Sequence, residues 1–83
     1  MHTLNKELET YFENQFDVTS SQGWKDLMEK VKEMVQKDSN LMTVKTEEEL
    51  FKRQGRLDIM AWLLNWRELC EITYRDLQNE QDL

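Results

Sequence analysis

The chain has 83 residues, which limits it to one small domain. It has no proline and only two glycines, a composition that favours helices and offers few of the turn residues that sheets need. Its 17 acidic and 11 basic side chains give a formal net charge of −6, which disfavours direct binding to nucleic acid. The longest apolar run, residues 59–64, is far shorter than the roughly 20 residues of a membrane span, and no secretory signal is visible. We therefore expect a soluble protein made in a reducing cytoplasm.

The first predicted helix covers residues 3–16, with Thr3 as its expected N-terminal cap. Its apolar residues recur at helical spacing: Leu4, Leu8, Tyr11 or Phe12, and Phe16. One side of this helix is therefore expected to pack on another element.

The second predicted helix covers residues 20–37, and Thr19 with Gln22 three positions later fits a capping box at its start. Its apolar residues form a one-sided stripe: Trp24, Leu27, Met28, Val31, Met34 and Val35. The connector that follows, residues 41–45, is expected to fold its apolar side chains back over the core.

The third predicted helix covers residues 46–78. Thr46 with Glu49 is the clearest cap in the chain, and the acidic residues 47–49 suit the positive end of a helix dipole. No helix breaker other than Gly55 appears before residue 78, so this helix would be about 48 Å long at 1.5 Å per residue. Gly55 either permits close approach of another helix or marks a kink. The predicted fold is all-α, a helical hairpin or three-helix bundle with a long C-terminal helix, formed by residues 1–83 as a single domain.

Residues that support catalysis or metal binding are scarce. The one histidine, His2, and the one cysteine, Cys70, are far apart in the sequence, and neither a nucleophile–base pair nor a zinc-ligand spacing is present. We therefore expect a protein that is not an enzyme, with no catalytic, metal-binding or cofactor-binding residues and no cofactor.

One basic cluster, Lys52, Arg53 and Arg56, could contact phosphate. The i, i+4 pairs of Glu48 with Lys52 and of Glu49 with Arg53 favour a solvated helix face instead.

The segment 57–70 carries an apolar band wider than a surface helix needs, so it predicts neighbours on at least two sides. The first two helices could supply both, or one side could bind a partner chain or a second copy. The candidate partner-binding residues are Ile59, Trp62, Leu63, Trp66, Leu69 and Cys70. Of the two tryptophans we assign Trp62 to the core and Trp66 to the partner.

Residues 51–64 contain an aromatic residue, basic residues, Gly55, and a Leu-Asp-Ile turn that leads into Trp-Leu-Leu. This segment resembles a pattern in small helical proteins of tailed bacteriophages. The resemblance implies a phage protein in the host cytoplasm, acting either as a virion or assembly component or as a modulator of a host protein.

Two functional hypotheses follow. The first is a virion or assembly component that packs its long third helix on a protein partner or on copies of itself, giving a homo-oligomer. The alternative is an acidic inhibitor of a host protein, a nucleic-acid mimic or anti-defence protein. The observation that supports this alternative is the set of carboxylates along the first helix: Glu7, Glu9, Glu13 and Asp17.

Overall fold

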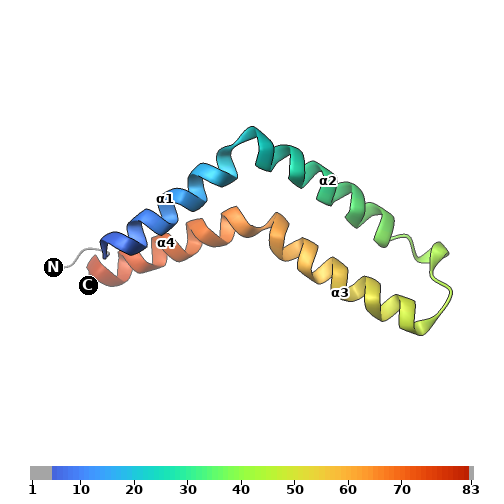
Figure 1. The fold of residues 1–83 in the computed structure, drawn as a ribbon. Coiled ribbons are helices and arrows are strands. Elements are labelled where there is room, and N and C mark those ends of the chain that lie inside the picture. Colours follow the sequence, from blue (N-terminus) through green and yellow to red (C-terminus); the bar gives the residue numbers. More distant parts are fainter. Residues whose placement is uncertain (1–4, 83) are drawn as a thin grey trace. The chain divides into compact units, whose positions relative to one another are not determined.

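The computed structural model describes residues 5–82, including the side chains of residues 5–80. Its elements are α1 (Lys6–Ser20), α2 (Gln22–Asp38), the short 3-10 helix η1 (Leu41–Thr43), α3 (Glu47–Leu64) and α4 (Trp66–Asp82) (Figure 1). No strand occurs within the described residues, and the predicted all-α fold class is confirmed.

The described helices fall into two compact units. The α1/α4 unit contains α1, the first turn of α2, and α4, whereas the α2/α3 unit contains Asp26–Asn65, that is the rest of α2, η1 and α3. Each unit is built on two helices, and each has its own small set of buried side chains.

The start of α1 is set by Asn5. Its side-chain Oδ1 accepts hydrogen bonds from the backbone N–H groups of Glu7 at 2.8 Å and Leu8 at 3.3 Å. These bonds satisfy donors that a helix start otherwise leaves without an acceptor. Thr3, the cap expected from the sequence, lies outside the described residues.

The break between α1 and α2 falls at Ser21, whose backbone is extended. The Ser21 hydroxyl accepts a hydrogen bond from the N–H of Trp24 at 3.1 Å and so caps α2. The predicted cap at Thr19 is wrong. Thr19 lies inside α1, buried, and its hydroxyl donates to the carbonyl oxygen of Gln15 at 2.7 Å, one helical turn back.

The predicted cap of α3 is confirmed. The Thr46 hydroxyl accepts a hydrogen bond from the N–H of Glu49 at 3.1 Å. The Glu49 carboxylate accepts in return from the N–H of Lys45 at 3.4 Å, one residue before the cap. Reciprocal bonding of this kind holds the chain in place where it enters the helix.

A single long helix over residues 46–78 is not confirmed, because α3 ends at Leu64 and α4 begins at Trp66. Asn65 between them has φ −96° and ψ 4°, outside the α-helical region. Asparagine is a poor helix former because its short side chain competes for backbone hydrogen bonds. The break therefore coincides with the one Asn inside this segment, and Gly55 lies within an unbroken helix.

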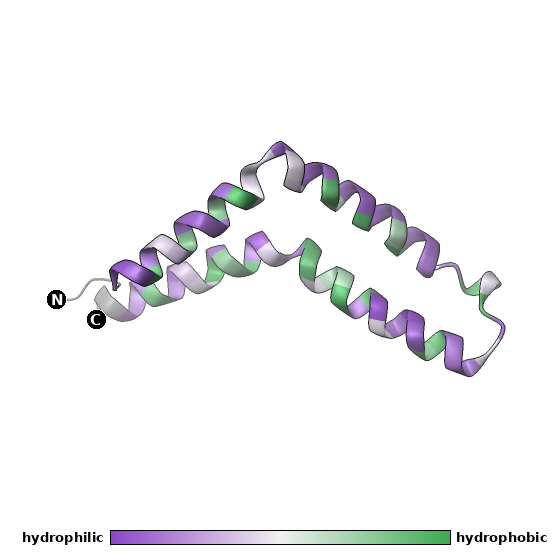
Figure 2. Ribbon diagram, in the orientation of Figure 1, coloured by the Kyte–Doolittle hydropathy of each residue, from purple (hydrophilic) through white to green (hydrophobic). Residues whose placement is uncertain are grey.

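The core of each unit is small. The side chains with less than a tenth of their surface exposed are Phe12, Thr19 and Cys70 in the α1/α4 unit, and Met28, Val31 and Met60 in the α2/α3 unit. Even Cys70, the most buried described residue, keeps 3 % of its surface exposed. Hydrophobic residues nevertheless recur along every helix (Figure 2). Many of them must therefore lie on exposed faces.

Candidate protein-binding surface

In the α1/α4 unit the two helices run antiparallel and meet through aromatic side chains. The ring of Tyr74 on α4 lies 5.3 Å from the ring of Phe12 and 5.8 Å from that of Phe16, centroid to centroid. These distances suit the tilted and edge-to-face arrangements that aromatic pairs prefer. The hydrophobic face of α1 is therefore covered by α4.

Arg67 on α4 closes the C-terminal end of α1. Its guanidinium donates to the carbonyl oxygen of Phe16 at 3.2 Å, to the Thr19 hydroxyl at 3.1 Å and to the Ser20 hydroxyl. The last turn of α1 has no basic residue of its own, so Arg67 supplies the cation that the negative end of a helix dipole favours.

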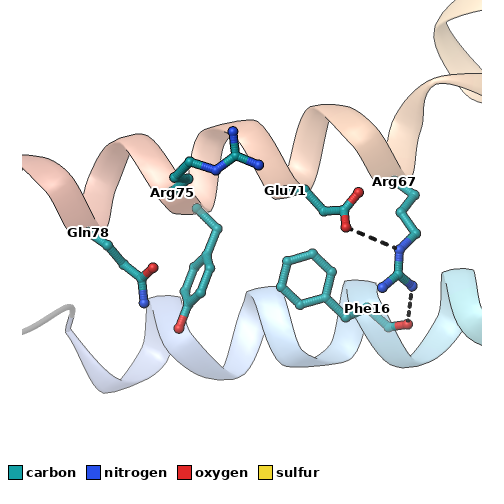
Figure 3. Close-up of a pocket in the computed structure, with 6 residues that line it drawn as sticks. Phe16, Arg67, Glu71, Arg75 and Gln78 are labelled. Atoms are coloured by element: carbon teal, nitrogen blue, oxygen red, sulfur yellow. Dashed lines mark hydrogen bonds and ion pairs between the residues drawn. The ribbon is translucent and has the colours of Figure 1, made fainter.

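An open hollow of about 280 Å³ lies beside Arg67 (Figure 3). Its lining residues are Phe16, Arg67, Glu71, Tyr74, Arg75 and Gln78. Arg67 also pairs with Glu71 at 3.9 Å, whereas the guanidinium of Arg75 points away from α1. The guanidinium of Arg67 is thus already bonded to α1 and to Glu71. Its presence beside the hollow is explained by the packing of α1 on α4, without a ligand.

Three predicted partner-binding residues, Trp66, Leu69 and Cys70, belong to this packing. The Trp66 indole N–H donates to the Gln15 side-chain oxygen at 2.9 Å, and all three residues line a small hollow against α1. Cys70 is buried, and burial raises the pKa of its thiol. Trp66, which we assigned to a partner, therefore contacts α1 in this chain.

The other three, Ile59, Trp62 and Leu63, lie in the α2/α3 unit. Ile59 exposes 65 % and Trp62 51 % of its surface, and Leu63 is half-buried. The assignment of Trp62 to the core is wrong. Sequence periodicity placed the two tryptophans on one face of a continuous helix, and the break at Asn65 separates them into different units.

Arg53 fixes the connector between α2 and α3. It donates to the carbonyl oxygen of Asn40 at 3.1 Å, to the Thr43 hydroxyl at 2.7 Å and to Glu49 at 2.8 Å. The expectation that the connector folds its apolar side chains over the core is wrong for Leu41 and Met42, which are 68 % and 93 % exposed. The backbone conformation held by Arg53 leaves these two side chains pointing outward.

The remaining members of the basic cluster are also in ion pairs. Arg56 donates to both carboxylate oxygens of Asp38, at 2.8 and 3.2 Å, and Lys52 lies 3.3 Å from Glu48. The Arg56 guanidinium holds the pKa of Asp38 below its ordinary value. The Arg56–Asp38 pair joins α3 to α2, whereas the Lys52–Glu48 pair lies within α3 on an exposed surface. Each member of the basic cluster thus has an acidic partner within the α2/α3 unit.

One side of α3 exposes a continuous apolar strip that we call the α3 apolar face: Phe51, Gly55, Ile59 and Trp62. At 100° per residue these four positions fall within about 80° of the helix circumference. Most of the buried and half-buried residues of α3 recur on the other side of the helix: Glu49, Leu50, Arg53, Leu57, Met60 and Leu64. The half-buried Leu63 lies between that side and Ile59. The α3 apolar face is thus turned away from the packed side of its own helix.

A groove of about 360 Å³ adjoins this face. Gly55 and Ile59 line it on one side and Met34 of α2 on the other, with Arg56 and Met60 between. Phe51 and Met34, 61 % and 51 % exposed, were not among the predicted partner-binding residues. Phe51 could have been predicted from the sequence, because it lies four residues before Gly55 and eight before Ile59 and so falls on the same side of a helix.

Comparisons of the chain with protein-family models, with curated proteins and with solved structures give no match. Within residues 5–82 no three His, Cys, Asp or Glu side chains are placed to hold a metal ion together. None of the described helices combines the length and apolar composition that a membrane crossing requires. The contacts described above account for the hollow beside Arg67 and for the basic cluster, whereas they do not account for the α3 apolar face. This face is therefore the candidate binding surface.

Proposed function

We propose that the protein is a non-enzymatic interaction protein that docks on another polypeptide through the α3 apolar face. The observation that carries this proposal is the exposure of Phe51, Ile59 and Trp62, each with more than half its surface in water, on one side of one helix. Scattered apolar residues are normal on protein surfaces, whereas aligned large ones mark interaction sites.

The composition of the strip suits a binding site. Aromatic side chains are enriched at the centres of protein interfaces because they bury a large area at a small cost in conformational entropy. The adjoining groove beside Met34 could accept a side chain of the partner, since methionine adapts its shape to different neighbours. The face thus offers both projecting rings and a recess.

The bacteriophage-like segment, residues 51–64, contains all four members of the α3 apolar face. We therefore propose virion assembly as the setting, with a virion protein or a second copy of this chain as the partner. The proposed mechanism is burial of the α3 apolar face, which requires neither a cofactor nor a catalytic group.

Site-specific photo-crosslinking in the source cells tests the proposal. A photo-reactive residue at position 59 should give a covalent adduct with a polypeptide, and mass spectrometry of the adduct and of purified particles should identify it. The matched control is position 36 on α2, an exposed residue outside the face. Absence of any adduct at position 59, or equal adducts at both positions, would overturn the proposal.

The salt dependence of association distinguishes docking through the α3 apolar face from the alternative, an acidic inhibitor of a host protein. Adduct formation through the α3 apolar face should persist at high salt, because apolar contacts are not screened. An association that weakens steeply with salt and survives loss of Ile59 would instead point to the carboxylates of α1 and to charge mimicry.

A further inference from the structure

We infer that the α1/α4 unit carries a second docking site, which binds a basic amphipathic helix of another polypeptide. One apolar side chain of that helix enters a small hollow beside Tyr11 and Leu69. Its basic side chains pair with three carboxylates, those of Glu7, Asp76 and Glu80. This site is separate from the α3 apolar face and goes beyond the function proposed for that face.

The hollow has a volume of about 110 Å³ and lies between α1 and α4. The exposed members of its lining are Tyr11 of α1, 44 % exposed, and Leu69 and Thr73 of α4, of which Leu69 is 38 % exposed. Pockets for drug-sized ligands measure roughly 300–1,000 Å³, so this hollow suits one side chain instead. A recess with an aromatic and aliphatic rim is where a protein partner buries an anchor residue.

Two exposed stripes of side chains run from the hollow toward one end of the unit. The stripe on α4 has members four, three and four positions apart, which places them on one side of the helix: Leu69, Thr73, Asp76 and Glu80. On α1, Glu7 lies one turn before Tyr11 and is also exposed. Because the two helices run antiparallel, the first turn of α1 lies beside the last turns of α4 (Figure 1). The three carboxylates therefore gather at that end.

The charged side chains of α1 and α4 along these two stripes are all acidic. The three carboxylates form no salt bridge with any residue that the structure describes. The basic residues of the two helices lie elsewhere. Arg67 and Arg75 line the larger hollow of Figure 3, and Lys6 falls about 140° from Tyr11 around α1. The site thus lacks cations of its own.

The spacing of apolar and acidic groups defines the partner. Leu69 lies seven residues before Asp76 and eleven before Glu80, about 10.5 and 16.5 Å along α4. A helix lying alongside matches this pattern with an apolar residue at one position and Lys or Arg seven and eleven positions away, all on one face. The three carboxylates would repel nucleic acid and anionic lipid. The same surface of a second copy would be repelled for the same reason.

Fluorescence anisotropy with designed peptides tests the site on the full chain. The two probes are helical peptides of about 18 residues, long enough to form a helix, with one leucine and with arginines seven and eleven positions away. The arginines follow the leucine in one probe and precede it in the other, so that both helix directions are covered. At least one probe should bind with micromolar affinity. Replacing its leucine by glutamine, or both arginines by glutamate, should abolish binding. Failure of both probes to bind would overturn the inference.

Variants of the protein separate a specific site from general attraction between opposite charges. Asp76→Asn combined with Glu80→Gln should weaken binding of the probe about fivefold or more, because two ion pairs at the edge of the site are lost. Glu13→Gln combined with Asp17→Asn is the matched control. It makes the same change of charge at two exposed positions of α1 outside the stripes. Equal losses in the two double variants would show attraction by net charge alone and would overturn the site.

Chemical-shift mapping by NMR places the bound peptide. The backbone amide signals of Leu69, Cys70 and Thr73 should move on addition of the probe. Ile59→Lys should bind the probe as the unchanged chain does, because position 59 belongs to the α2/α3 unit. Shifts confined to α3, with binding lost in Ile59→Lys, would place the peptide on the α3 apolar face and overturn the second site. The crosslink from position 59 is read independently, so failure of one site is distinguishable from failure of the other.

Discussion

Arg67 on α4 lies over the ring of Phe16 on α1, 5.4 Å from its centroid, and donates to the carbonyl oxygen of that same residue at 3.2 Å. One side chain thus makes a cation–π contact and a helix cap across two helices. Because α1 has no basic residue in its last turn, both interactions depend on the pairing with α4.

Arg67→Ala should lower the free energy of unfolding by about 2 kcal/mol, because it removes charge-assisted hydrogen bonds from the end of α1. Arg67→Lys should recover part of this loss, since an ammonium keeps the charge and loses the planar fork. Urea unfolding followed by circular dichroism measures both. Arg75→Ala is the control, because that guanidinium points away from α1 (Figure 3). Equal losses at positions 67 and 75 would contradict the assignment.

The two tryptophans should respond differently to truncation. Trp66→Ala should destabilise the α1/α4 unit by about 3 kcal/mol, since it removes packing against α1 and the hydrogen bond to Gln15. Trp62→Ala should leave the melting temperature nearly unchanged and weaken association. Thermal melting combined with mass measurement tests the pair. A larger loss of stability at position 62 would show that Trp62 is the better buried residue.

Thr46→Ala should cost about 1 kcal/mol, because it leaves the N–H of Glu49 without its acceptor at the start of α3. Thr10→Ala provides the matched control. The Thr10 hydroxyl bonds back to the carbonyl oxygen of Lys6 within α1, where alanine is the better helix former, so the same substitution should be neutral or slightly stabilising. Shifts of the unfolding midpoint that are equal in size and sign for the two substitutions would contradict the role of Thr46 as the cap.

Acid should weaken the α2/α3 unit through Asp38. The hydrogen bonds from Arg56 hold the pKa of Asp38 in the folded protein below its ordinary value of 3.8. Because the folded-state pKa is the lower one, the stabilisation is complete above pH 3.8 and is lost as the pH falls through that value toward the folded-state pKa.

An NMR titration of the Asp38 carboxyl carbon, with stability measured in parallel, tests the prediction. Glu49, whose pKa is lowered by the hydrogen bond from Arg53, should respond in the same direction. Asp38→Asn should flatten the pH dependence of stability, whereas Glu29→Gln on the exposed side of α2 should keep it. An Asp38 that titrates at its ordinary pKa would show that the pair with Arg56 does not hold in solution.

Local features were readable from the sequence. The Thr46 cap, the absence of strands and the helical periodicity depend on residues three or four positions apart, and such interactions are the same whatever the rest of the chain does. The cap of α2 was misplaced by two residues, because Thr19 and Ser21 are both suitable caps. The choice between them depends on the burial of Thr19 against α4, a contact with Arg67 that lies 48 residues away.

The identity of the buried faces was settled only by tertiary structure. Periodicity correctly places Ile59 and Trp62 on one side of a helix, and it cannot show whether another helix covers that side. The contacts that decide the matter join residues distant in the chain: Trp66 with Gln15, Arg67 with Phe16, and Arg56 with Asp38. Each requires two helices to meet at one particular rotation about their axes. Composition and periodicity therefore determine that this chain is helical and amphipathic, whereas side-chain packing between distant segments determines that Trp66 is covered while Ile59 and Trp62 remain exposed.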